Sequence, residues 1–183
     1  AYAANGERFA FFSAACLDML PKLDFRPDIV HANDWHTGLV PFLLKHRYGS
    51  DPFYANIRSV ISIHNAVFKG VFRYDEVQCL RESHSRNVPD AGVSSTHIAM
   101  LKAGVLNADK INAVSPTYAE ELQTELGSHG MAWEFQQRAQ DLVGILNGCD
   151  YSAWNPETDT YLPVNYCADQ QSMTQGKKAC KQA

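Results

Sequence analysis

The feature that most constrains this chain is a repeated order of apolar strand, polar cluster and helix. Short runs at residues 28–31, 58–63, 110–114 and 143–146 read as strands, and helical patterns separate them. Strands that alternate with helices favour a parallel sheet covered by helices. We therefore predict an α/β fold with a parallel sheet and helices on both faces.

Helices are expected at residues 5–20, 38–48, 94–106 and 115–126, with a further one from residue 168. Pro21 should end the first, Thr37 should cap the second and Ser115 should cap the fourth. In residues 66–93 the apolar positions follow neither a helix nor a strand periodicity, and residues 152–164 are rich in turn formers. The first helix carries an apolar stripe predicted to face the core: Phe9, Phe12, Cys16 and Leu20.

Polar residues directly follow every predicted strand. These polar clusters occupy residues 32–36, 64–65, 115–118 and 147–148. All strands of a parallel sheet end at one edge, and ligands bind in the crevice outside those carboxyl ends. The four clusters are therefore predicted to line one crevice that binds a polar ligand.

In the first two clusters, single residues have both a structural and a functional interpretation. His36 can exchange hydrogen bonds with a ligand in the crevice, and we favour that role over a loop histidine. Asp34 could orient His36, but an Asx-turn or cap that holds the loop is favoured. Trp35 is expected in the core. His64 and Asn65 either present groups that bind hydroxyls or form a turn.

The other two clusters are read in the same way. Ser115 is expected to be a cap, and the helix it opens, with Thr117 and Tyr118, offers free N–H groups that suit phosphate. Asn147 and Gly148 are most simply a tight turn in which glycine supplies a positive φ.

Composition excludes several other classes of protein. The net charge of −4 gives no basic face for nucleic acid, and no apolar run approaches the roughly 20 residues that span a bilayer. The five cysteines include no CxxC pair, so we expect reduced thiols in a cytosolic-type compartment and no structural metal. Nucleotide-binding glycine loops, GxSxG and HExxH are missing. Both ends of the chain look cut, because no initiator Met begins it and it stops inside a predicted helix.

Four segments in order resemble those of bacterial-type glycogen and starch synthases. The first is RPDIVHANDWHTG at residues 26–38, and the second is SIHNAVFKG at residues 62–70. The third combines LKAGVLNAD at 101–109 with AVSPTYAEE at 113–121, and the fourth combines GILNGCD at 144–150 with WNPETD at 154–159. Any one motif is weak evidence, but four in order cover the chain from end to end.

This resemblance implies a GT-B glycosyltransferase, in which two Rossmann-like domains face each other across a deep cleft. Such enzymes transfer glucose from ADP-glucose to the non-reducing end of an α-1,4-glucan with retention, and need no metal or cofactor. It implies that residues 1–165 are part of the N-terminal catalytic domain and that 166–183 begin the connection to the second. His36 matches the active-site histidine that contacts the donor glucose. His64, Asn65 and the region from Ser115 through Thr117 to Tyr118 match segments lining the same cleft.

The chain also departs from the family's pattern. The family's Lys-x-Gly-Gly-Leu loop and its whole second domain, with the basic pair that binds the donor phosphates, do not occur in the 183 residues. Ala4 precedes Asn5 where the family usually has Asp. We therefore expect this chain alone to be inactive, and the parent enzyme to be cytoplasmic, or plastidic if it comes from a plant. The alternatives are a truncated glucan-binding module without catalysis, or another GT-B enzyme such as a relative of sucrose synthase.

Overall fold

The structure is a computed structural model that describes residues 4–77 and 96–183. The chain divides into two compact units, one ending at Leu146 and the other running from Asn147 to Ala183, and each is described by itself. The boundary expected at residue 165 concerns the domains of the family and stays a prediction.

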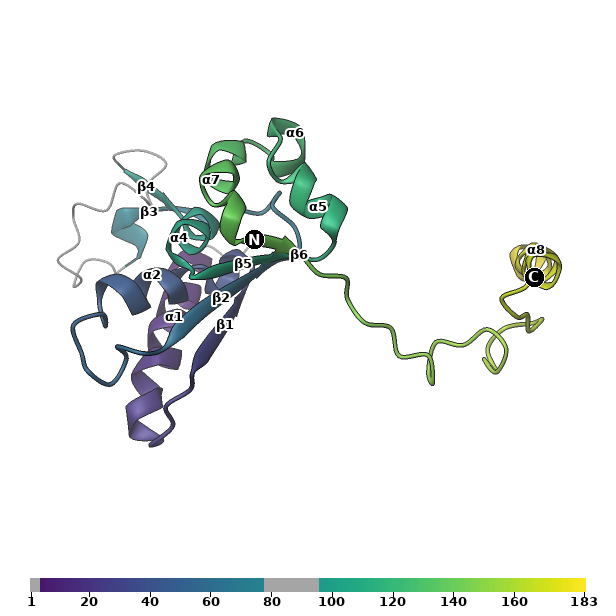
Figure 1. The fold of residues 1–183 in the computed structure, drawn as a ribbon, viewed down its shortest axis with the longest axis horizontal. Helices are drawn as coiled ribbons and strands as arrows, with labels where there is room; N and C mark the ends of the chain where they lie inside the picture. The colour runs from purple at the N-terminus through teal and green to yellow at the C-terminus, as the bar shows by residue number, and fades with distance from the viewer. Residues whose placement is uncertain (1–3, 78–95) are drawn as a thin grey trace. The chain divides into compact units, whose positions relative to one another are not determined.

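A four-stranded parallel sheet organises the first unit (Figure 1). Its strands lie in the order β1 (Ile29–Asn33), β2 (Arg58–Ile63), β5 (Lys110–Ala113) and β6 (Leu142–Gly144). All three pairings are parallel, with Ala32 beside Ile61 and Ile61 beside Ile111. The α/β fold with a parallel sheet is confirmed, and each predicted strand is present with ends that shift by at most a few residues.

The connecting helices pack on one face of this sheet. The strands follow one another in sequence order, so right-handed crossovers place each connection on the same side. That side is covered by α1 (Asn5–Lys22), α2 (Leu39–His46) and α4 (Met100–Asn107), and it contains the fully buried Ile61 and Ile111. On the other face, Ile29 is 57% exposed and Val143 is 50% exposed. Within the described residues, therefore, the crossover helices cover one of the two faces that were expected to be covered.

The first helix follows the predicted stripe only in part. Phe9 and Leu20 pack against the core, whereas Phe12 and Cys16 are exposed. The buried positions of α1, which contacts α2, are instead Ala10, Ala14 and Leu17. Pro21 also does not end the helix, which continues to Lys22.

Two short strands interrupt the region predicted as loop and helix. β3 (Val71–Arg73) pairs antiparallel with β4 (His97–Ala99), and η2 (Tyr74–Glu76) follows β3. The helix predicted over residues 94–106 therefore begins as a strand and becomes α4 only at Met100. Residues 66–93 were predicted to lack a regular period. Those from residue 78 onward lie outside the described residues.

The helix predicted over residues 115–126 is broken into two. Ser115 caps α5 (Pro116–Glu121) as expected, and Thr124 then caps a separate α6 (Glu125–Ser128). Between α6 and β6 lie α7 (Ala132–Gln137) and η3 (Ala139–Asp141), which the sequence patterns did not predict. α7 packs on α4, where Lys102 and Glu134 form an ion pair.

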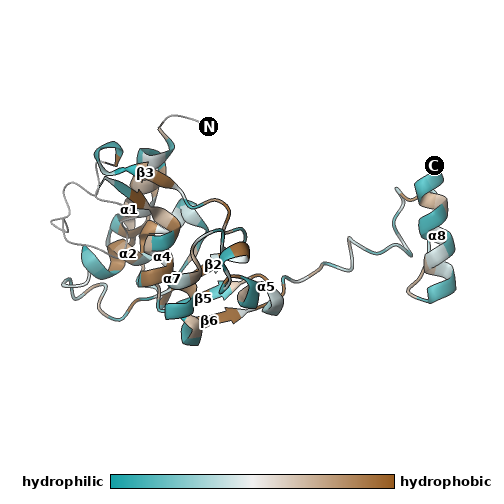
Figure 2. Cartoon of the chain, turned by 90° about the horizontal axis from the view of Figure 1, so that it is seen from above, coloured by the Kyte–Doolittle hydropathy of each residue, from teal (hydrophilic) through white to brown (hydrophobic). Residues whose placement is uncertain are grey.

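The second unit contains turns and one helix. Residues 151–163 form successive turns, and α8 (Gln170–Gln182) follows with Asp169 as its cap. α8 is largely hydrophilic, in contrast to the hydrophobic β6 (Figure 2). The tight turn predicted at Asn147 and Gly148 is absent, and Gly148 does not have a positive φ. No helix in the described ranges is long and apolar enough to cross a membrane.

Candidate functional site

Three of the four predicted polar clusters meet at the carboxyl edge of the sheet. They follow β1, β2 and β5, which are neighbours in the sheet and end at the same edge. Hydrogen bonds connect the first cluster to the second, and Ala66, the residue after the second, to the third. Three of the clusters that were predicted to share a crevice are therefore linked to one another.

Asp34 connects the β1 loop to the β2 loop. Its Oδ1 lies 2.8 Å from the backbone N of His64 and 3.4 Å from that of Asn65, and accepts hydrogen bonds from both. It makes no side-chain cap on η1 (Trp35–Thr37), the short helix that it precedes. The Asx-turn or cap predicted for Asp34 is therefore not formed, and the carboxylate holds the neighbouring loop instead of its own.

His64 and Asn65 are both exposed at this edge. The Nε2 atom of His64 is 3.0 Å from Oδ1 of Asn33. Oδ1 of Asn65 accepts a hydrogen bond from the backbone N of Val67, so Asn65 forms a local Asx-turn. Among residues 4–77 and 96–183, no group bonds to the Asn65 NH2 group or the His64 Nδ1 atom. Both interpretations of this pair, turn and ligand-binding group, therefore fit the structure.

The start of α5 forms the third part of the site. The Ser115 hydroxyl accepts a hydrogen bond from the backbone N of Tyr118 at 2.9 Å, which makes it the predicted cap. The Tyr118 hydroxyl accepts one from the backbone N of Ala66, also at 2.9 Å. Burial raises the pKa of Tyr118, and the charge of Asp34 adds to that effect. Thr117 is exposed on the first turn of α5.

His36 lies in η1, immediately after β1, and its side chain is exposed. Its ring packs on Trp35 with centroids 4.1 Å apart and meets the edge of Phe9 at 4.8 Å. Trp35 packs against the core, as predicted, and touches Phe72. Among the described residues, nothing forms a hydrogen bond with the His36 ring, so both of its nitrogens are open to a ligand.

Thr37 has a different role from the helix cap that was predicted. Its hydroxyl accepts a hydrogen bond from the backbone N of Asn33 and donates one to the backbone O of the same residue. These bonds close the β1 loop around His36. Thr37 is therefore a support of the candidate site, and α2 begins without a side-chain cap.

Sequence reasoning missed two residues that shape the site. Asn33 lies within the first cluster, but the order of residues gave no sign that its side chain reaches His64. Phe9 contacts His36 from α1, and no signal in the sequence links positions that are 27 residues apart. Asn147 and Gly148 belong to the second unit, so the structure does not place them in the site.

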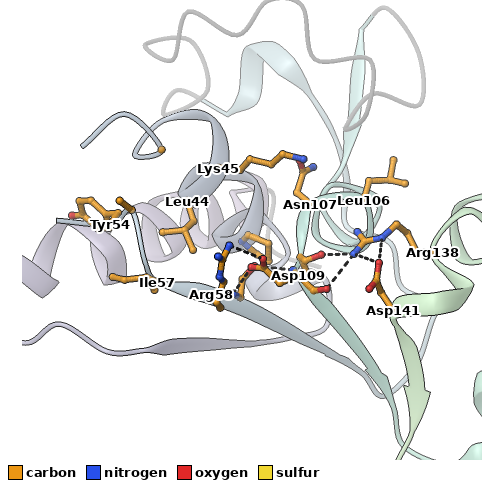
Figure 3. A pocket seen from close by; sticks show the side chains of 15 residues that line it. Leu44, Lys45, Tyr54, Ile57, Arg58, Leu106, Asn107, Asp109, Arg138 and Asp141 are labelled. Atoms are coloured by element: carbon orange, nitrogen blue, oxygen red, sulfur yellow. Dashed lines mark hydrogen bonds and ion pairs between the residues drawn. The ribbon is translucent and has the colours of Figure 1, made fainter. Parts of the chain in front are cut away.

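A cavity of ≈ 630 Å³ lies at the opposite, amino edge of the sheet (Figure 3). Its lining includes Arg58 at the start of β2, Asp109 just before β5 and Asp141 just before β6. Its position separates it from the three linked clusters. Several of the polar groups that line this cavity bond to one another.

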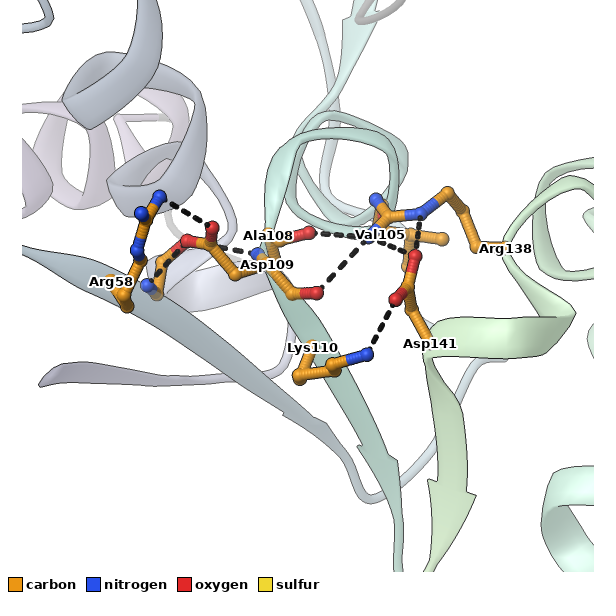
Figure 4. Close-up of polar contacts among 8 residues, drawn as sticks. Arg58, Val105, Ala108, Asp109, Lys110, Arg138 and Asp141 are labelled. Atoms are coloured by element: carbon orange, nitrogen blue, oxygen red, sulfur yellow. Dashed lines mark hydrogen bonds and ion pairs between the residues drawn. The ribbon is translucent and has the colours of Figure 1, made fainter.

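Ion pairs and hydrogen bonds join the strand starts along this cavity (Figure 4). Asp109 accepts hydrogen bonds from the backbone N and the hydroxyl of Ser59, and it pairs with Arg58. Asp141 pairs with Lys110 and Arg138, and its pKa is lowered, first by the hydrogen bond from Lys110. These contacts fasten β2, β5 and β6 together.

Arg138 also stabilises the carboxyl end of α4. Its guanidinium donates hydrogen bonds to the backbone oxygens of Val105 and Ala108. A cation at the end of a helix satisfies carbonyl groups that lack partners within the helix. The amino edge is therefore a structural network, and the carboxyl edge remains the candidate site.

No three His, Cys, Asp or Glu side chains come together as a metal site would require, within the part of the chain that is described. The expectation of metal-independent chemistry stays a prediction. The four cysteines that the structure describes are free thiols: Cys16, Cys149, Cys167 and Cys180.

Comparison with known proteins identifies close relatives. The family model described as the starch synthase catalytic domain matches residues 1–137. Proteins named glycogen synthase from Vibrio parahaemolyticus and Vibrio vulnificus are 84% and 81% identical over 183 residues, which is the whole of this chain. The chain spans 38% of the length of each of these two relatives.

A solved structure has the same fold. The catalytic domain of starch synthase IV from Arabidopsis thaliana, bound to ADP and acarbose, matches with a TM-score of 0.77 and 28% identity. The match covers all of this chain and 38% of that one.

Proposed function

The chain belongs to the starch synthase catalytic domain family, and from this premise we propose that it forms part of a glycogen synthase. The proposed reaction transfers glucose from ADP-glucose to the non-reducing end of an α-1,4-glucan, with retention of the anomeric configuration. The observation that carries the proposal is the meeting of three polar clusters at one sheet edge, linked through Asp34–His64 and Tyr118–Ala66.

We propose that His36 contacts the donor glucose. Its ring is exposed, and its position is fixed by Trp35 and Phe9. A group held in this way loses little entropy when the reactive complex forms, so it favours a productive pose of the sugar. His64, Asn65 and the Ser115–Tyr118 turn would complete the wall of the cleft, and the NH2 group of Asn65 can donate to a sugar hydroxyl.

The leaving ADP needs positive charge that the described site does not supply. ADP is bound to the starch synthase IV domain, and it is the group that an ADP-glucose donor would release. Preorganised donors that meet developing charge give the largest electrostatic contribution to such reactions. We propose that these donors come from the parts of the family's proteins that lie beyond the 38% spanned by this chain.

The similarity to bacterial glycogen synthases favours this enzyme over a sucrose synthase relative, and favours the cytoplasm over the plastid as its compartment. We also propose that a second GT-B domain lies across the cleft and that the reaction needs no metal and no cofactor. A binding module without catalysis remains an outcome of the test below.

The test is a chimera in which these 183 residues replace the matching segment of the Vibrio parahaemolyticus glycogen synthase. Incorporation of radiolabelled glucose from ADP-glucose into glycogen would be measured beside the unmodified relative. We expect activity comparable to that of the relative. A chimera that folds and binds glycogen but incorporates no glucose would favour the binding module.

A further inference from the structure

The loop that follows β2 has an unusual pattern of hydrogen bonds. Four consecutive backbone N–H groups, from His64 to Val67, each donate to a side chain. Asp34 accepts the first two, Tyr118 accepts the third and Asn65 accepts the fourth. The acceptors for the first three N–H groups come from segments on either side of the loop.

We propose that Asp34 and Tyr118 are positioning residues that hold the 64–66 backbone between η1 and α5 and so orient His64 and Asn65 toward the substrate. This proposal rests on the proposed function, because it assigns the two side chains a task in the same site. It also gives Tyr118, which was expected in a segment that lines the cleft, a more specific task.

The end of the sheet explains why side chains are needed. β2 ends at Ile63, so the backbone N–H groups that follow it do not take part in the hydrogen bonds of the sheet. Ala66 is fully buried, which keeps water from satisfying its N–H group. An unpaired buried N–H group would be costly, so the Tyr118 hydroxyl determines whether this loop conformation is stable.

The backbone of Asp34 supports the same conclusion. Asp34 has φ of 53°, in the left-handed region that non-glycine residues rarely adopt. Such a conformation persists where surrounding contacts fix it, and it is found often at functional sites. The contacts here are the two hydrogen bonds to the β2 loop and the bond from the Asp34 backbone N to the Ser62 backbone O. The carboxylate is thus held toward the neighbouring loop.

Tyr118, the second positioning residue, is held in place by α5, the helix that contains it. The Ser115 cap fixes the first turn of α5 and with it the direction of Tyr118. The hydroxyl of Tyr118 accepts a hydrogen bond from the backbone N of Ala66. The α5 side of the loop is therefore held by a side chain whose own helix is capped.

Hydrogen exchange of the 183-residue chain, followed by NMR, tests the contacts without requiring activity. Tyr118→Phe removes one hydroxyl and should speed exchange at the Ala66 amide by roughly three- to tenfold, the range expected for the loss of one hydrogen bond. Tyr54→Phe is the matched control, since it removes a hydroxyl that bonds to Leu17 far from the loop. It should leave the Ala66 amide unchanged.

A pair of substitutions separates the carboxylate of Asp34 from its backbone conformation. Asp34→Gly accepts the positive φ but lacks the oxygen, so exchange at His64 and Asn65 should rise. Asp34→Asn keeps the shape of the side chain and an oxygen that can accept both hydrogen bonds, so exchange should stay slow. Unchanged exchange in Tyr118→Phe and Asp34→Gly would overturn the proposal. An equal rise in the exchange rates of the core amides of β2 would also overturn the proposal, since it would indicate that the two side chains stabilise the whole fold.

The chimera with the Vibrio parahaemolyticus relative gives a second readout. A positioning role predicts that Tyr118→Phe and Asp34→Gly lower kcat about tenfold with little change in KM for ADP-glucose, and that Asp34→Asn restores most of the rate. Full kcat in both variants would overturn the positioning role. An inactive unmodified chimera would count against the proposed function, while the exchange experiment would still decide whether the two side chains hold the loop.

Discussion

The Asp34 carboxylate accepts a hydrogen bond from the backbone N of His64, 30 residues further along the chain, at 2.8 Å. Together with the bonds from Asn65 to Asp34 and between His64 and Asn33, this contact joins the ends of the first two strands of the sheet. These bonds bring two polar clusters that are separate in sequence into one site.

Gly144 should be required where β6 meets α5. A Cβ atom at this position would overlap the backbone of Ser115 and Pro116, whereas a Cβ atom at Gly148 would meet nothing within 4 Å. Gly144→Ala should therefore lower the free energy of unfolding by about 1–3 kcal/mol, as overpacking does. Gly148→Ala, the control, should change it little. Urea denaturation measures both, and equal effects would contradict the assigned packing.

The ion pair between Lys102 and Glu134 should stabilise the contact of α4 with α7. The two side chains are only 17% and 11% exposed, and their charged atoms are 2.9 Å apart. Glu134→Ala would leave a cation with little water, at a cost of about 3–5 kcal/mol. The exposed pair of Arg73 and Asp75 is the control, and Asp75→Ala should lower the stability much less. Similar losses of stability in both variants would show that burial does not matter here.

Stability should fall at alkaline pH because of Tyr48. Burial, followed by the hydrogen bond to Asp18, raises its pKa above the ordinary value of 10.0. Above that value the unfolded chain loses the proton while the folded chain keeps it, so the unfolded state binds fewer protons and the free energy of unfolding decreases with pH. Tyr48→Phe should flatten the decline between pH 10 and 11. An unchanged slope in urea titrations across this range would argue against the assignment.

The 183-residue chain on its own should transfer no glucose. It spans 38% of its Vibrio relatives, and the proposed binding of the ADP leaving group depends on residues beyond that span. A cleft without its second side also cannot exclude water from the reacting centre. Radiolabelled ADP-glucose and glycogen would be incubated with the purified monomeric chain, with a full-length relative as the control. Clear incorporation by the chain would mean that the present residues suffice for catalysis.

Strand–helix alternation allowed the parallel sheet and the edge that carries the site to be predicted. Strand bounds came out well where a short run lies directly before a polar pair, as residues 58–63 do before His64 and Asn65. The pairing of β3 with β4 was missed, because two three-residue strands are too short to show a period. The α1 stripe was only partly right, since Phe9 packs against the core but Phe12 is exposed.

The candidate site was predicted in outline but not in its contacts. The position of polar clusters after strands placed His36, His64 and Tyr118 at one edge. The partners of these residues come from distant parts of the chain, as with Phe9 beside His36 and Ala66 beside Tyr118. Such pairings depend on how the loops pack against one another, and the local sequence does not indicate that packing.

The most direct test of the account is the rate of the chimera carrying His36→Ala. If His36 holds the donor glucose, the loss of one positioned contact should cost about 3 kcal/mol, or roughly a hundredfold in turnover with ADP-glucose and glycogen. The melting temperature should be unchanged, because the His36 side chain is exposed and caps no helix. A folded His36→Ala chimera that retains nearly the full rate would contradict the central claim that this edge of the sheet is the glucosyl-transfer site.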